Sequence, residues 1–178
     1  MASKKKIAPD RVVRSPNWDE RPAGTAVTLL VVHAISLPPG RYGGDAIEKL
    51  FTNRLDPQAH PYFRRIASLK VSSHFLIRRD GELVQFVSPH KRAWHAGLSS
   101  WRGRGRCNDF SVGVELEGAE GARFRPVQYR RLRRLIQALR AKLPLRDLAA
   151  HSDVAPGRKF DPGARFDWAR LLSSLATH

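Results

Sequence analysis

Apolar residues recur along the chain at spacings that predict alternating strands and helices. The run at 25–35 is rich in β-branched residues and is typical of a buried strand. Two more strands are expected at 71–79 and 82–88. The turn signal at 79–82 joins them, which predicts an antiparallel hairpin. A fourth strand is expected at 111–118.

Alternation within this fourth strand assigns its residues to two faces. Val112, Val114 and Leu116 share one face, so Glu115 and Glu117 point to the other. A carboxylate on a buried strand face is costly unless a charge or a metal ion offsets it. Glu115 is therefore either an ordinary outward-facing residue or a functional carboxylate.

Helical spacing appears in three segments, at 45–55, 126–143 and 166–176. The second segment shows the clearest apolar stripe, formed by Leu132, Leu135, Ile136, Leu139 and Leu143. Its arginines lie mostly off the stripe, which indicates a solvated face. Mixed strands and helices with an internal hairpin favour a single α/β or α+β domain built around one sheet.

The domain organisation follows from length and proline placement. Three prolines interrupt residues 1–22, which are expected to be an extended lead-in. Residues 23–178 are expected to form one domain. The loop predicted at 89–109 is long enough to be functional or disordered.

Charge and composition indicate which kinds of molecule the protein binds. The net charge of +16 attracts phosphates and carboxylates. No nucleic-acid-binding motif accompanies it, so we expect a small anionic substrate and no nucleic acid. No apolar run approaches the ~20 residues of a membrane span, and no apolar core of a signal peptide follows the basic start. We therefore expect a cytoplasmic monomer without a membrane partner.

Candidate chemistry gathers in the loop at 151–163. Proline and glycine break regular structure there, yet His151, Lys159 and Asp161 lie close together. Cys107 is the only cysteine, so a metal ion would need histidine and carboxylate ligands. His33, at the end of the first predicted strand, is a further candidate. Spacing alone leaves a metal site and hydrogen-bonded structural histidines both open.

Several segments resemble a known family. These are LLVVHAISLPPGRYGG, SSHFLIRRDGELVQFV, KRAWHAGLSSWRGRGRCNDFSVGVELEG and HSDVAPGRKFDPG. They are similar to the zinc-dependent N-acetylmuramoyl-L-alanine amidases of the type-2 family, and the resemblance runs from about residue 16 to 170. It is strongest to the branch that acts on anhydro-muropeptides in cytoplasmic peptidoglycan recycling.

The resemblance implies a fold, a cofactor and a reaction. The fold is a central mixed sheet flanked by helices, shared with peptidoglycan-recognition proteins. One Zn²⁺ ion would be held by His33, His151 and Asp161. Glu115 would transfer the proton, and Lys159 would stabilise the oxyanion. The bond cleaved would join the lactyl group of N-acetylmuramic acid to L-alanine.

Substrate contacts are implied for Arg106, Trp94 and His95. The chain departs from close relatives at two positions: Ala34 replaces the usual asparagine and Lys70 the frequent arginine. Both departures concern the fine tuning of substrate binding.

Two alternatives stay open within this resemblance. One is a lytic amidase of intact peptidoglycan, and the other is a module that binds peptidoglycan without cutting it. Such modules usually lack a zinc ligand, whereas the residues matching all three ligands are present here.

Overall fold

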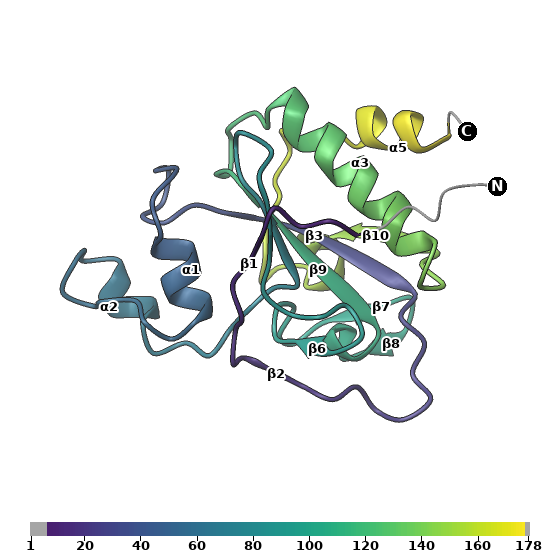
Figure 1. The fold of residues 1–178 in the computed structure, drawn as a ribbon, viewed down its shortest axis with the longest axis horizontal. Coiled ribbons are helices and arrows are strands. Elements are labelled where there is room, and N and C mark those ends of the chain that lie inside the picture. Colours follow the sequence, from purple (N-terminus) through teal and green to yellow (C-terminus); the bar gives the residue numbers. More distant parts are fainter. Residues whose placement is uncertain (1–6, 177–178) are drawn as a thin grey trace.

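A six-stranded mixed sheet forms the centre of the computed structural model, which describes residues 7–176 (Figure 1). Its strands lie in the order β1-β5-β4-β9-β3-β10. They are β1 (Arg11–Val12), β3 (Leu29–Ile35), β4 (Phe75–Ile77), β5 (Leu83–Gln85), β9 (Ser111–Glu117) and β10 (Asp147–Ala150). β9 runs parallel to β3 and β4, and β10 runs parallel to β3, whereas β4 and β5 form the predicted antiparallel hairpin. The mixed sheet confirms the predicted fold class.

Helices flank the sheet on both faces. They are α1 (Ala46–Phe51), α2 (Phe63–Ile66), α3 (Pro126–Arg140), α4 (His151–Val154) and α5 (Trp168–Ala176). In Figure 1, α3 and α5 lie together on one side, and α1 and α2 lie on the other. Within residues 7–176, no helix has the length and apolarity that crossing a membrane requires.

The apolar stripe of α3 packs on the sheet as its spacing predicts. Four of the five stripe residues lie in α3, and Leu143 follows it, because the helix ends at Arg140 and not at the predicted residue 143. All five are buried in one cluster with Val112, Val114 and Leu116 of β9. Leu76 and Val84 of the hairpin belong to a second cluster with α1, on the opposite face. Period-two alternation therefore gives each central strand two buried faces.

Residues of the predicted lead-in take part in two sheets. β1 pairs with β5, and β2 (Trp18–Asp19) pairs antiparallel with β6 (Arg92–Ala93). Residues 1–6 and 177–178, at the ends of the predicted 1–22 and 23–178 segments, lie outside the described part.

The predicted 89–109 loop contains short regular elements. Besides β6 it forms a hairpin of β7 (Ser100–Trp101) and β8 (Arg104–Gly105), followed by the 3₁₀ helix η1 (Cys107–Asp109). The pattern did not predict β10 because four residues are too few to show a period. It also did not predict α4, which begins at His151, where a loop was expected.

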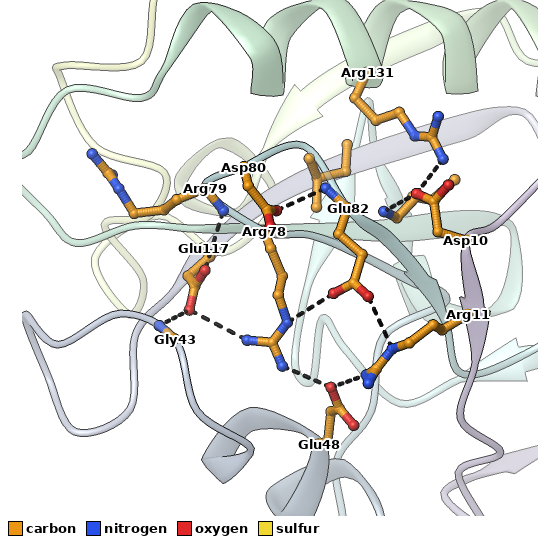
Figure 2. A network of polar contacts seen from close by, with 12 residues as sticks. Asp10, Arg11, Gly43, Glu48, Arg78, Arg79, Asp80, Glu82, Glu117 and Arg131 are labelled. Atoms are coloured by element: carbon orange, nitrogen blue, oxygen red, sulfur yellow. Dashed lines mark hydrogen bonds and ion pairs between the residues drawn. The ribbon is translucent and has the colours of Figure 1, made fainter.

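A partly buried ion network joins α1 to the hairpin and to the end of β9 (Figure 2). The Arg78 guanidinium lies 2.7 Å from Glu48, 3.3 Å from Glu82 and 3.4 Å from Glu117. Glu117 is 2% exposed, and it also accepts the backbone N–H of Gly43 at 2.6 Å and of Arg79 at 3.1 Å. The network therefore ties the Gly43 loop and α1 to the sheet.

This network predicts that the effects of its two central charges, Arg78 and Glu117, are coupled. Removing one partner of a buried ion pair leaves the other charge uncompensated, which costs about 3–5 kcal/mol. We expect Arg78→Met to lower the free energy of unfolding by about 3 kcal/mol. The double variant with Glu117→Gln should lose less than the sum of the two single variants. Urea unfolding of all four proteins measures this coupling, and additive losses would contradict it.

Candidate metal centre

The register of three parallel strands brings distant residues side by side. His33 of β3 pairs with Glu115 of β9, and Val32 pairs with Ala150, the last residue of β10. His151 directly follows β10. The carboxyl ends of parallel strands meet at one edge of a sheet, where α/β proteins place their ligands. Both histidines therefore reach this edge although they are far apart in sequence.

The predicted ligand atoms converge there. The Nδ1 atoms of His33 and His151 lie 2.9 Å apart. Asp161 places Oδ2 3.4 Å from His33 Nδ1 and 3.1 Å from His151 Nδ1. The loop after α4 returns to this position because the Ser152 N–H donates to the Asp161 carbonyl at 3.0 Å. The structure thus gathers all three predicted ligands in one group.

The protons of this group are directed away from its centre. His151 Nε2 lies 3.3 Å from the Ala96 carbonyl, which can only accept, so the ring proton sits on Nε2 and Nδ1 keeps its lone pair. Burial lowers the pKa of His33 to about 4, so this ring is neutral at pH 7. Burial raises the pKa of Asp161, yet its close contacts with His151 and His33 lower it overall.

This donor set fits a metal ion. Ligands about 2.0–2.1 Å from a tetrahedral zinc ion lie about 3.3 Å from one another, close to the separations seen here. A cation would satisfy lone pairs that otherwise face each other across the site. Three protein ligands leave a fourth position for water or substrate.

Glu115 lies beside this group on a buried strand face. It is 8% exposed, and its Oε2 is a buried atom without a hydrogen-bond partner among residues 7–176. Burial and the nearby Asp161 raise its pKa well above the usual range, while Lys159 opposes the shift. Glu115 is therefore not an ordinary outward-facing residue, and its carboxylate is a strong proton acceptor.

A groove of about 540 Å³ opens over the site. His33, His151, Asp161, Glu115 and Lys159 all line it. Its far wall comes from the loop before α1 and from α1 itself, the parts that the Arg78 network holds.

The residues predicted to bind substrate lie in two different places. Trp94 and His95 line the groove, and Trp94 Nε1 donates to Asp19 Oδ1 of β2 at 3.1 Å. Arg106 does not line it. Its side chain is 75% exposed, pairs with Asp109 at 3.2 Å and borders an adjoining pocket that Trp94 also lines.

Sequence reasoning missed residues that hold the histidines. Ser111 Oγ lies 3.1 Å from His95 Nε2, and Asn108 Oδ1 accepts the N–H groups of His95 and Ala96 at 3.2 and 2.8 Å. The alternation of β9 offered one signal, because Ser111 shares a strand face with Glu115.

The mixed sheet with this cluster at its carboxyl edge defines a single-domain α/β protein with a candidate metal centre. The pattern of N-acetylmuramoyl-L-alanine amidases matches residues 23–164, and the chain belongs to that family.

Relatives of similar length support this membership. The chain is 55% identical to the 1,6-anhydro-N-acetylmuramyl-L-alanine amidase AmpD of Escherichia coli K12, over 90% of this chain and 89% of the relative. It is 54% identical to AmpD of Citrobacter freundii, over 93% and 89% of the two chains. The resemblance stated from the sequence is confirmed.

Solved structures show the same fold. The crystal structure of a selenomethionine AmpD derivative superposes with a TM-score of 0.93 at 50% identity, covering 98% of this chain and 99% of the other. The E. coli amidase AmiD, solved with anhydro-N-acetylmuramic acid-L-Ala-D-γ-Glu-L-Lys, gives a TM-score of 0.62 at 27% identity, covering 87% and 60%.

The convergence of three ligands predicts stoichiometric metal binding. We expect zinc-reconstituted protein to retain one zinc ion per chain after dialysis, and a strong chelator to remove it. His151→Ala and Asp161→Ala should each retain far less zinc. His90→Ala is the matched control, because His90 is exposed and lies outside the cluster. Elemental analysis measures the content, and full retention by both ligand variants would contradict the assignment.

Proposed function

We propose that the protein is a zinc-dependent amidase of anhydro-muropeptides. It hydrolyses the amide bond between the lactyl group of 1,6-anhydro-N-acetylmuramic acid and L-alanine. The observation that carries this proposal is the gathering of His33, His151, Asp161 and Glu115 at one edge of the groove. The preference for the anhydro sugar is supported by the relatives named above, which are 1,6-anhydro-N-acetylmuramyl-L-alanine amidases.

His33, His151 and Asp161 would hold one zinc ion. Zinc at such a site lowers the pKa of a bound water to about 7 and polarises a carbonyl oxygen. Neutral imidazoles and one carboxylate, without cysteine, suit this catalytic type of zinc site.

Glu115 acts as the proton carrier. Its unpartnered Oε2 takes a proton as water attacks the lactyl carbonyl carbon. The carboxyl then gives that proton to the alanine nitrogen as the C–N bond breaks. The raised pKa favours this role, because a more basic carboxylate takes up the proton of the attacking water more readily.

Lys159 stabilises the negative charge that develops on the carbonyl oxygen. It lines the groove together with Asp161. A positive charge acts most strongly in a site that excludes water.

The muropeptide is a small anionic substrate, which the positive charge of the protein attracts. Trp94 lines both the groove and the adjoining pocket that holds Arg106. We propose that Trp94 contacts the substrate and that Arg106 pairs with a carboxylate of the stem peptide. The cytoplasmic location and the monomeric state stay predictions, tested by cell fractionation and by light scattering.

A cleavage assay tests the reaction. Anhydro-muramoyl tripeptide is incubated with protein that is zinc-loaded, chelator-treated or reloaded with zinc, and the products are identified by mass spectrometry. We expect free anhydro sugar and an intact tripeptide beginning at L-alanine in the two zinc-containing samples. Intact peptidoglycan, tested in parallel, should be cut much more slowly. Faster cutting of that polymer would favour a lytic amidase, and no cleavage at all a binding module.

The proton-carrier role predicts a specific defect in Glu115→Gln. The amide cannot accept the proton, so kcat should fall by about 10²–10⁴-fold while zinc content stays unchanged. Glu20→Gln is the control, because Glu20 lies on the surface with 71% of its side chain exposed. Near-normal turnover by Glu115→Gln would remove Glu115 from this role.

The oxyanion role predicts that Lys159→Met mainly lowers kcat. Loss of one oxyanion-stabilising group costs about 10²–10³ in kcat. The Michaelis constant should change little, because the charge develops only in the transition state. Lys49→Met, on the exposed side of α1, serves as the control. A change confined to the Michaelis constant would instead make Lys159 a substrate-binding residue.

A further inference from the structure

His95 lies between the candidate metal ligands and strand β9. Its Nδ1 is 2.9 Å from Nε2 of His33, the ring nitrogen that faces away from the other two ligands. Its Nε2 is 3.1 Å from Ser111 Oγ. The Ser111 hydroxyl in turn donates to the Cys107 carbonyl at 2.6 Å. One chain of hydrogen bonds thus runs from a backbone carbonyl to a metal ligand.

The direction of each bond in this chain follows from its fixed end. The Cys107 carbonyl has no proton, so it takes the only one on the Ser111 hydroxyl. Ser111 Oγ must then accept from His95, which places the His95 proton on Nε2. The neutral ring keeps a lone pair on Nδ1, which accepts the Nε2 proton of His33. His33 Nδ1 is left with its lone pair toward His151 and Asp161.

We propose that Ser111 and His95 position His33, holding its ring in the tautomer and orientation that offer Nδ1 to the metal ion. This inference rests on the proposed zinc site. It also changes the role of His95, which the sequence assigned to substrate binding. His95 is here a positioning residue, because it acts through His33.

Gly113 makes room for this arrangement. It shares a face of β9 with Ser111 and Glu115. A Cβ atom at position 113 would lie 2.5 Å from Cγ and 2.6 Å from Nδ1 of the His95 ring. Any side chain there would displace the ring from His33.

The turn that carries His95 and Ala96, directly after β6, also orients His151, the second histidine ligand. Asn108 Oδ1 holds the N–H groups of His95 and Ala96, and the Ala96 carbonyl accepts the Nε2 proton of His151. Two consecutive residues therefore direct both imidazoles, one through its side chain and one through its backbone. Partners of this kind typically change metal affinity by about 10–100-fold when they are removed.

Zinc affinity and ring-proton placement test the inference on the full chain. Dissociation constants are measured by competition with a chelating dye. We expect His95→Phe, which keeps a ring but no acceptor, to weaken zinc binding about 10–100-fold. His95→Asn offers Oδ1 near the place of Nδ1 and should recover most of the affinity. His90→Asn, on the surface, is the matched control and should bind zinc like the wild type.

The ring protons are located by ¹⁵N-resolved NMR of the zinc-free wild-type protein. We expect the proton of His33 on Nε2 and that of His95 on Nε2. A proton on Nδ1 of His33, or a folded His95→Phe with wild-type zinc affinity, would overturn the proposal. Should His95→Phe not fold, Ser111→Ala takes its place: it keeps the His95 ring and should still weaken zinc binding, and unchanged affinity there would overturn the proposal.

These measurements distinguish the positioning of His33 by Ser111 and His95 from the proposed function. A zinc-loaded wild type that cleaves no muropeptide contradicts the amidase proposal. The differences in zinc affinity and the positions of the ring protons would then still support the positioning role of Ser111 and His95. A wild type that binds no zinc overturns both.

Discussion

The parallel pairing of β9, β3 and β10 is the constraint on which the site depends. Pairing in this register sets Glu115 beside His33 and carries His151 to the same edge. A slip of one residue would turn His33 to the face that α3 covers, because side chains alternate along a strand. The buried faces of β3 and β9 prevent such a slip, since Leu30, Val32 and their neighbours belong to the main core. Core packing therefore fixes the geometry of the polar site.

Two glutamates on one face of β9 show how burial can serve structure or chemistry. Glu117 is surrounded by donors: the backbone of Gly43 and Arg79 and the Arg78 guanidinium. These interactions compensate its charge and hold one wall of the groove in place. Glu115 has a buried oxygen without a partner and a raised pKa. Leaving that oxygen unpaired costs stability, and unpaired groups with a raised pKa are typical of functional sites.

The short strands β2 and β6, which lie outside the main sheet, help to orient the residues of the site. β2 pairs with β6, and Asp19 holds the Trp94 indole at the groove. The turn after β6 then carries His95 and the Ala96 carbonyl to His33 and His151, the two candidate histidine ligands. Residues that looked like a lead-in and a loop thus form a supporting layer behind the site. Such a layer is needed because a free imidazole can rotate and exchange tautomers.

The sequence by itself determined the helices with clear stripes, the hairpin, the alternation that separates Glu115 from Val114, and the kinds of residue available as ligands. These features depend on local spacing, which a single chain displays directly. The resemblance to the amidase family added the ligand set. Only the tertiary structure decided that His33 and His151, 118 positions apart, meet with Nδ1 facing inward. It also revealed β10, the strands within 1–22, and the separation of Arg106 from the groove. The pairing of distant strands and the placement of the ring protons both depend on contacts between residues far apart in the sequence. Such contacts leave no periodic pattern in a single chain.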